Sequence, residues 1–467
     1  MADTTEEVSR PRPGRRDDDE RTLGLAILWS AEPGRVGEIL FVTSRSVLGR
    51  GREVEQDAKR LTPVLQRPGE NEPRAPFARS TLSREQLLVE PLDDGLTLRR
   101  IGRRALLDAR GNAVDSIATR PGDVVEIEDE LVLMTVERPR VLPRTPAGLE
   151  VPRPEFGRAD PLGVVGESEA AWKLRAAVAF LAARSAHVLV LSPSGCGKEL
   201  VARGIHALSS RSRRTMVCRN AATFAETLVD AELFGTAANF PNAGMPERIG
   251  LVGEAEGSTL FFDEIGDMPE ALQTRLLRLL DPGADYQRLG DPRRRTAQFR
   301  FIGATNRPLD MLRLDVAARF KLQLTIPGLD ERREDVPLIA AELVRQIATT
   351  DAAAARFCGP EPALSPSFVR LLATWPFAAH VRELEALLWR AITSTSGERL
   401  EAPDLGTARD AAHRTQTIRP DELTKEEIAA ALERSQGVRE RAWRELGLAN
   451  RHVLKRLLKK YGLSSED

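Results

Sequence analysis

The strongest chemical signal is a glycine-bearing loop at residues 192–199, Ser-Pro-Ser-Gly-Cys-Gly-Lys-Glu. It follows the apolar run Val188–Leu191 and leads into Leu200–Ala202, which is the order strand, loop, helix. Such a loop can turn its backbone N–H groups toward a phosphate at the helix N-terminus, while a lysine reaches the outer phosphates. Ser192 stands where a glycine is usual, and Pro193 offers no backbone donor. The predicted nucleotide-binding residues of the loop are Gly195, Cys196, Gly197, Lys198 and Glu199.

A second stretch is an apolar run that ends in two carboxylates, Asp263 and Glu264. A magnesium-nucleotide site needs one carboxylate to hold Mg²⁺ and another to polarise a water molecule. Asp263 fits the first role and Glu264 the second. Their distance along the chain from Lys198 suits two strands of one doubly wound sheet. An isolated Asp-Glu pair more often begins a solvated loop, but the two stretches together favour a site for a nucleotide and Mg²⁺.

Composition sets broad limits on the protein class. The chain has 467 residues, is 42% hydrophobic and 29% charged, and carries a formal net charge of -1. This length suits about three domains, and the near-zero charge restricts any nucleic-acid contact to a local patch. The three cysteines, Cys196, Cys218 and Cys358, have no metal-site spacing and indicate a reducing, cytoplasmic setting. No stretch is long and apolar enough to predict a membrane span.

The N-terminal part is predicted to be a β-sandwich. Residues 1–22 are rich in Arg, Asp, Glu and Pro and are predicted to form a disordered tail. Residues 23–136 contain short apolar runs separated by turn residues, which is typical of an all-β sandwich. Residues 137–160 are dense in proline and are predicted to form a semi-rigid linker.

Three segments of this region, Leu48–Gly51, Leu82–Arg84 and Arg120–Ile127, resemble the forkhead-associated (FHA) domain, which binds phosphothreonine peptides. The resemblance implies that Arg50, Ser83 and Arg84 contact phosphate, where guanidinium groups form strong charge-assisted bonds. Gln86 stands where the family has a structural histidine, and residues 103–104 are Arg-Arg in place of Asn-Gly. An FHA-like sandwich that no longer binds phosphothreonine is therefore the open alternative.

From residue 161 helical and strand patterns alternate, which predicts an α/β subdomain over 161–330. Residues 165–400 resemble the AAA+ ATPase domain of bacterial enhancer-binding proteins, the activators of sigma-54 RNA polymerase, and this resemblance implies a helical lid over 331–402. The matching motifs, in order, are Gly197–Glu199, Glu232–Gly235, Thr259–Gly266, Ala304–Arg307, Glu331–Pro337 and Val381–Leu384. The resemblance implies an ATP- and Mg²⁺-dependent ATPase in which Lys198 binds the β- and γ-phosphates.

Further site residues follow from this resemblance alone. Asn220 would restrain the water-polarising glutamate, and Asn306 would sense the γ-phosphate. Arg313 and Arg319 would reach into the site of a neighbouring subunit, so hydrolysis would need a homo-oligomeric ring, commonly a hexamer. Arg382, in the lid, would contact the nucleotide from the other side.

Two segments depart from the family pattern. Asn239–Gly244 occupies the place of the Gly-Ala-Phe-Thr-Gly-Ala loop that touches sigma-54, and Pro241 is expected to stiffen it. Trp375–His380 replaces the usual Trp-Pro-Gly-Asn approach to the lid helix. Two hypotheses remain open. The protein remodels sigma-54 RNA polymerase at promoters in response to a phospho-signal, or it is an ATP- and DNA-binding regulator of the same architecture that does not activate sigma-54.

The C-terminal region is predicted to bind DNA. Residues 403–423 form a polar linker, and residues 424–463 contain three helical segments in a helix-turn-helix order. They resemble the Fis-type module of enhancer-binding proteins, whose last helix enters the major groove of an upstream promoter site. Asn450 would cap that helix. The base-edge candidates are Arg451, His452 and Lys455, and the phosphate-contact candidates are Arg456 and Lys459.

Overall fold

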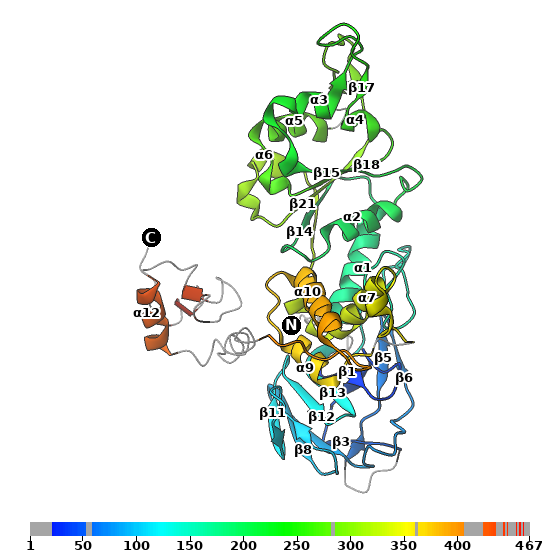
Figure 1. The fold of residues 1–467 in the computed structure, drawn as a ribbon, viewed down its shortest axis with the longest axis vertical. Helices are drawn as coiled ribbons and strands as arrows, with labels where there is room; N and C mark the ends of the chain where they lie inside the picture. The colour runs from blue at the N-terminus through cyan, green and yellow to red at the C-terminus, as the bar shows by residue number, and fades with distance from the viewer. Residues whose placement is uncertain are drawn as a thin grey trace, which may run out of the picture.

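The computed structural model describes residues 21–52, 58–281, 285–359, 363–405 and 424–435, together with Ala442, Trp443, Leu446, Leu454, Leu457, Leu458 and Tyr461. Figure 1 shows a β-rich unit at one end, an α/β unit at the other, and helices α7, α9 and α10 between them. Within the described part of the chain, every helix is too short or too polar to cross a bilayer.

The N-terminal unit is built of two packed sheets, so the expected all-β architecture is present. The strands of the eight-stranded sheet are, in spatial order, β10 (Ala113–Val114), β9 (Leu106–Leu107), β12 (Val124–Ile127), β13 (Leu131–Pro139), β1 (Arg21–Ser30), β2 (Ile39–Phe41), β5 (Val64–Arg67) and β6 (Glu70–Pro73). The strands of the five-stranded sheet are β11 (Ser116–Thr119), β8 (Gly95–Arg100), β7 (Leu87–Leu92), β3 (Ser46–Leu48) and β4 (Lys59–Arg60). Because β13 continues to Pro139, the sandwich extends past the expected boundary at residue 136.

Strand β1 is apolar on both faces, and this explains why the sandwich packs against the lid. Leu25 and Ile27 belong to the core between the two sheets. Since side chains alternate across a strand, Ala26 and Leu28 point the other way, and they share one hydrophobic core with the lid. The lid helices are α7 (Val336–Ala348), α8 (Ala352–Ala355), α9 (Pro366–Thr374) and α10 (His380–Ser394).

Polar contacts reinforce this interface between the sandwich and the lid. The Trp29 indole donates to the carbonyl of Leu364 (2.9 Å), and Arg138 of β13 pairs with Glu334 (2.9 Å). Arg370 of α9 pairs with Glu126 of β12. The sequence patterns predicted the two units and a linker between them, but the packing of one on the other was not anticipated.

The α/β unit contains a five-stranded parallel sheet in the order β15 (Val217–Asn220), β18 (Thr259–Asp263), β21 (Arg300–Thr305), β14 (Val188–Leu191) and β22 (Leu322–Thr325). The longer helices of this unit are α1 (Glu169–Ala182), α2 (Lys198–Ala207) and α5 (Glu270–Leu280). Parallel strands place their carboxyl ends at one edge of a sheet. Residues that follow β14, β18 and β21 are therefore neighbours.

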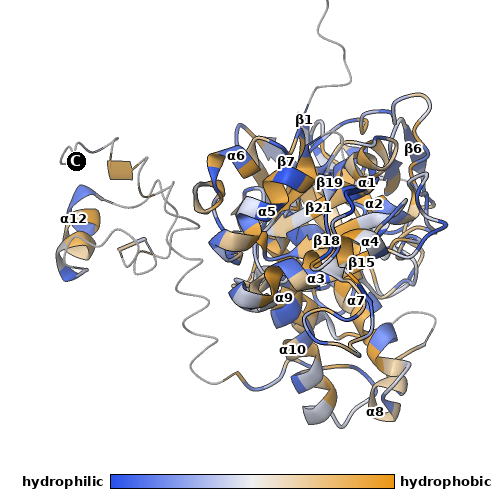
Figure 2. Ribbon diagram, turned by 90° about the horizontal axis from the view of Figure 1, so that it is seen from above, coloured by the Kyte–Doolittle hydropathy of each residue, from blue (hydrophilic) through white to orange (hydrophobic). Residues whose placement is uncertain are grey.

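The remaining elements of the α/β unit are short: α3 (Val229–Phe234), β16 (Gly235–Thr236), β17 (Arg248–Ile249), α4 (Leu251–Glu254), β19 (Asp285–Tyr286), β20 (Arg295–Thr296) and α6 (Leu314–Ala317). Near the C-terminus, α12 (Lys425–Arg434) contributes Ile428 and Ala431 to a small apolar cluster with Leu446, Leu454 and Leu458. Figure 2 shows hydrophobic and hydrophilic residues alternating along the helices, as expected for helices that bury one face.

Candidate functional site

The loop between β14 and α2 has a backbone shape that requires glycine. Gly195 and Gly197 have φ values of 85° and 89°, a left-handed conformation that L side chains rarely adopt. A Cβ added to Gly195 would lie 2.2 Å from the carbonyl oxygen of Ala379 in the lid. The glycines therefore permit both the tight turn and the close approach of the lid.

This loop forms one wall of a cavity of about 360 Å³. The structure brings together at this cavity the predicted residues Gly195, Cys196, Gly197, Lys198, Glu199, Asp263, Glu264 and Arg382. The other walls are formed by Gly163–Val165 and Leu174 on the α/β side and by Arg332, Ile339, Leu343 and Gln346 of the lid. Arg332 lies in the motif Glu331–Pro337, whereas no local pattern marked Ile339, Leu343 and Gln346, because they come from an ordinary amphipathic helix.

The cavity holds a cation and two carboxylates at its base. Lys198 is only 7% exposed, and its ammonium group pairs with Glu264 (3.1 Å). Asp263 accepts a hydrogen bond from the backbone N–H of Glu264 (2.9 Å). Burial raises the pKa of the Asp263 carboxyl, although the charge of Lys198 opposes that rise. A partly desolvated carboxylate at the end of a strand fits Mg²⁺, which proteins hold through one or two carboxylates beside substrate phosphates.

The lid touches the loop directly. The backbone N–H of Val381 donates to the carbonyl of Gly195 (3.1 Å), and the guanidinium of Arg382 donates to the hydroxyl of Ser194 (3.0 Å). The first turn of α10 is thus joined to the loop that is predicted to bind phosphate. A movement of the lid would therefore displace that loop.

Other predicted residues of the α/β unit lie outside the described cavity wall. The Asn220 side chain accepts from the N–H of Ala222 (2.9 Å) and makes no described bond to the Glu264 carboxylate. Asn306 is exposed just after β21. The functional roles predicted for these residues remain predictions.

The two arginines expected to act on a neighbouring subunit are exposed and paired within this chain. Arg313 pairs with Asp315 (2.9 Å), and its side chain is 41% exposed. Arg319 pairs with Asp281 (3.1 Å), and both side chains are 44% exposed. Exposed ion pairs of this kind are weak, so either arginine can exchange its partner for another anion at little cost.

The segment in place of the sigma-54 contact loop lies between β16 and β17. Residues 241–249 are exposed throughout, and Met245 and Ile249 are exposed hydrophobic residues. Phe240 is half-buried, and its ring lies so close to Gly290 that a Cβ there would be 2.6 Å from it. The aromatic residue is therefore seated against the α/β unit rather than at the exposed tip.

The sandwich brings its predicted phosphate-binding residues together. The N–H of Arg50 donates to the carbonyl of Ser83 (3.0 Å), and the hydroxyl of Ser83 accepts from the N–H of Arg103 (3.0 Å). Arg60 donates to the carbonyl of Arg84 (2.7 Å). One backbone bond and two bonds between side chain and backbone thus hold Arg50, Ser83 and Arg84 on adjacent loops that carry further arginines.

Gln86 takes a structural position beneath these loops. It is fully buried, and its side-chain amide donates to the carbonyl of Arg104 (2.8 Å). Gln86 can therefore fix the loop at residues 103–104 through this hydrogen bond. The FHA resemblance led us to expect a histidine at position 86. The replacement leaves the loop anchored.

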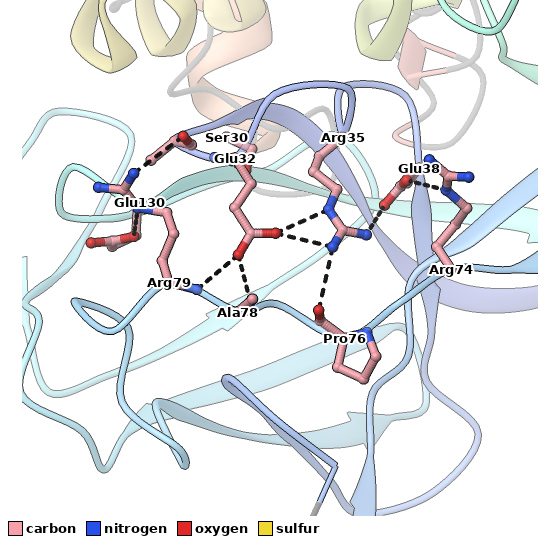
Figure 3. Close-up of polar contacts among 10 residues, drawn as sticks. Ser30, Glu32, Arg35, Glu38, Arg74, Pro76, Ala78, Arg79 and Glu130 are labelled. Carbon is pink, nitrogen blue, oxygen red and sulfur yellow. Dashed lines mark hydrogen bonds and ion pairs between the residues drawn. The ribbon is translucent and has the colours of Figure 1, made fainter.

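A polar network, drawn in Figure 3, fixes the segment that leads into Ser83. Glu32 pairs with Arg35 (3.0 Å) and accepts hydrogen bonds from the N–H groups of Ala78 (2.5 Å) and Arg79 (3.0 Å). These backbone bonds lower the pKa of the Glu32 carboxyl, although burial opposes them. Arg79 also pairs with the buried Glu130 (3.2 Å). The segment that leads into Ser83 is thus held by charged side chains that neutralise one another in pairs.

The DNA-contact candidates lie outside the described residues. They are Asn450, Arg451, His452, Lys455, Arg456 and Lys459. The neighbouring described residues Leu454, Leu457 and Leu458 belong to the apolar cluster that includes Ile428 of α12. Described residues of α12 and of the region after it therefore share one apolar cluster, and the helix-turn-helix stays a prediction.

Sheet, loop and lid together define the AAA+ ATPase core that the sequence motifs led us to expect. A family model described as the Sigma-54 interaction domain matches residues 164–325, and one described as the AAA+ ATPase lid domain matches residues 330–422. The chain belongs to the family of sigma-54-dependent transcriptional regulators.

Individual relatives are similar to this chain over 260 to 311 residues. The chain is 35% identical over 311 residues to the transcriptional regulatory protein ZraR of Escherichia coli strain K12, a match that spans 64% of this chain and 69% of that protein. It is 35% identical over 260 residues to the formate hydrogenlyase transcriptional activator FhlA of the same strain, spanning 54% of this chain and 36% of that protein. A crystal structure of NtrX from Brucella abortus in complex with ADP is 29% identical, with a TM-score of 0.46, and covers 65% of this chain and 70% of that chain.

Proposed function

We propose that this protein is an ATP-hydrolysing, DNA-binding regulator that remodels sigma-54 RNA polymerase in response to a phosphorylated partner. The observation that carries the proposal is the convergence of Lys198, Asp263 and Glu264 on one cavity beneath the lid, in a chain of this family. A buried lysine at a helix N-terminus beside two strand-end carboxylates suits phosphoryl transfer.

Each group at the base of the cavity has a role in this proposal. Lys198 and the N–H groups at the start of α2 bind the outer phosphates. Asp263 would hold Mg²⁺, which when bound neutralises charge on the phosphates. Glu264 orients the attacking water and accepts its proton. Because the carboxylate of Glu264 now lies 3.1 Å from Lys198, a phosphate that takes the lysine frees Glu264 for that task.

We propose that turnover needs a homo-oligomeric ring, hexameric as is common in this family. Arg313 and Arg319 are exposed outside the described cavity wall and held only by weak surface pairs. In a ring they would leave these aspartates and stabilise the charge that develops on the neighbouring subunit's phosphates.

The sandwich is proposed to read the upstream signal by binding a phosphothreonine segment of a partner protein. The arginines at positions 50 and 84 flank Ser83 on loops that backbone bonds hold together. Guanidinium groups and a hydroxyl arranged in this way can surround a phosphate with charge-assisted hydrogen bonds. The C-terminal helical unit is proposed to hold the protein at a DNA site upstream of the promoter.

A second candidate function is an ATP- and DNA-binding regulator that does not act on sigma-54. The position of Phe240 favours it, because the ring lies against Gly290 while the exposed tip consists of small and polar residues and Met245. Retention of sigma-54 RNA polymerase by the full-length protein, loaded with a transition-state nucleotide analogue, separates the two. Specific retention excludes the second candidate, and its absence in a protein that hydrolyses ATP excludes sigma-54 remodelling.

ATP turnover measured against protein concentration tests the ring ATPase. We expect cooperative turnover in the wild type and its loss in Glu264→Gln and Arg319→Ala. Arg153→Ala is the matched control, because Arg153 also forms an exposed pair, with Glu70 (3.3 Å), but lies in the linker. A wild-type protein that binds ATP and shows no turnover at any concentration contradicts the ATPase proposal.

A further inference from the structure

One buried cation of the nucleotide cavity has no partner among the described residues. Arg332 lines the cavity and is 6% exposed. Its Nε atom is buried without a hydrogen-bond partner, and no described ion pair includes its guanidinium. A desolvated charge without a partner is costly in a protein interior, so the structure carries this cost unless an anion enters the cavity.

The acidic residues that follow Arg332 are engaged elsewhere. Glu334 pairs with Arg138 of the sandwich (2.9 Å). Asp335 accepts hydrogen bonds from the backbone N–H of Ser168 (2.9 Å) and from its hydroxyl (2.5 Å), at the start of α1. Neither carboxylate is left to neutralise Arg332 by direct contact.

The acidic residues that precede Arg332 also make their described hydrogen bond and ion pair with other groups. Glu331 accepts from the backbone N–H of Gly328 (3.1 Å). Asp330 is half exposed and faces the His380 ring (3.7 Å). The turn that carries Arg332 therefore holds several carboxylates and yet leaves this guanidinium unpaired.

The surroundings place Arg332 against the phosphate loop. Its charge acts on the thiol of Cys196 and opposes the effect of burial, which raises the pKa of that thiol to about 11. Arg175, fully buried beside Asp160 (2.9 Å), adds a second positive charge nearby. Burial lowers the pKa of Arg332 itself, and the nearby charge of Asp335 opposes this shift without a direct ion pair; an arginine remains charged at neutral pH.

We propose that Arg332 binds the phosphate chain of the nucleotide from the lid side of the cavity, opposite Lys198. This inference rests on the proposed nucleotide-binding function and adds a phosphate contact from a second subdomain. The phosphates supply the anion that the protein lacks, and Arg332 joins the lid to the ligand. Arg382, which already donates to Ser194 of the loop, is not the unpaired cation.

The test compares binding of ATP, ADP and adenosine to the full-length protein by calorimetry. We expect Arg332→Met to weaken ATP and ADP by about 10- to 100-fold, the range for a lost hydrogen bond to a charged group, and adenosine by less than about twofold. Arg333→Met is the matched control, because Arg333 lies on the same turn, does not line the cavity and donates only to the carbonyl of Ala373 (3.5 Å). It should bind all three ligands as the wild type does.

Thermal unfolding without nucleotide supplies the second readout. Because Arg332→Met removes an unpaired buried charge, we expect an equal or higher Tm, with a smaller rise on adding ATP. A lower Tm in the absence of nucleotide, unchanged ATP affinity, or an equal loss of adenosine binding overturns the proposal. A wild-type protein that binds no ATP overturns the proposed function instead, and thus the two failures are distinguishable.

Discussion

The nucleotide cavity and the arginine-bearing loops of the sandwich are both predicted to bind phosphate, but they hold their cations differently. In the cavity Lys198 and Arg332 are 7% and 6% exposed. On the sandwich Arg84 is exposed, and Ser83 and Arg50 are half-buried. A cation in a desolvated cavity interacts strongly with an anion, whereas water and salt screen an exposed one.

Substitutions should have larger effects in the cavity than on the sandwich. In the cavity, geometry is fixed by left-handed glycines and by contact with the lid, so few substitutions are tolerated. On the sandwich, backbone hydrogen bonds fix the loops and leave several arginines beside one another. Loss of one cation should reduce function more strongly in the cavity than on the sandwich.

The largest expected effect is that of Lys198→Ala. It removes the buried cation opposite the phosphates, and we expect ATP turnover to fall by about 100-fold or more. Fluorescent-nucleotide binding and phosphate release measure the two steps. Glu264→Gln should bind ATP and fail to hydrolyse it. Turnover in Lys198→Ala within about threefold of wild type would break the comparison, because the cavity would then be as tolerant as an exposed site.

Arg138→Ala should have the next largest effect, because it tests whether the two regions are mechanically joined. Arg138 is 3% exposed and pairs with Glu334, which follows Arg332 by two residues in the sequence. Removing one partner of a buried pair costs about 3–5 kcal/mol, so urea unfolding should show a loss of this order. The exposed pair Arg45–Glu90 (3.4 Å) is the control, and Arg45→Ala should cost about 1 kcal/mol at most. Equal losses in both variants would show that the sandwich–lid interface is not held by the buried pair.

Arg84→Ala should weaken binding of a phosphothreonine peptide by about tenfold, in keeping with one exposed charge-assisted bond. Titration of the peptide at low and high salt checks it, and the difference between variant and wild type should shrink as salt rises. Arg120→Ala, at an exposed arginine that pairs with Asp94 (2.8 Å), is the control. If wild type binds neither the phosphorylated nor the unphosphorylated peptide, the sandwich has a structural role only.

The smallest expected effect concerns acid sensitivity. His187, which accepts a hydrogen bond from the N–H of Phe301 (3.0 Å), has its pKa lowered to about 4, chiefly by burial. Between its usual pKa of 6.5 and 4 the unfolded chain binds a proton that the folded chain does not. The stability present above pH 6.5 is therefore lost as pH falls, by about 2 kcal/mol at pH 4.5.

His187→Asn keeps an acceptor for Phe301 and should remove this loss, which denaturant unfolding at pH 7 and pH 4.5 measures. The sandwich sequence, residues 23–136, contains no histidine. Burial instead raises the pKa of its Glu126 carboxyl. Because that shift favours the protonated folded state, its effect on stability has the opposite sign. An unchanged acid loss in His187→Asn would assign the sensitivity to other groups.

Sequence alone determined the features that local chemistry dictates. A strand, a glycine loop and a lysine predict a phosphate-binding loop, and an apolar run ending in Asp263-Glu264 predicts a neighbouring strand end, because these patterns need only residues adjacent in the chain. The β-rich N-terminal unit was predicted for the same reason, whereas the lid was predicted from the resemblance of residues 165–400 to the AAA+ domain. The roles of Asn220, Arg313 and Arg319 depend on a neighbouring subunit or another ligand state, and they stay predictions.

Tertiary structure alone decided how the units meet and which charges are paired. The packing of β1 on the lid unites residues over 300 positions apart, as in the Trp29–Leu364 bond, and nothing local encodes which apolar face covers which. The pairing of Lys198 with Glu264 and the isolation of Arg332 likewise depend on what several distant segments leave unneutralised. Burial and pairing are properties of the assembled interior, so they follow from the folded structure and not from the sequence.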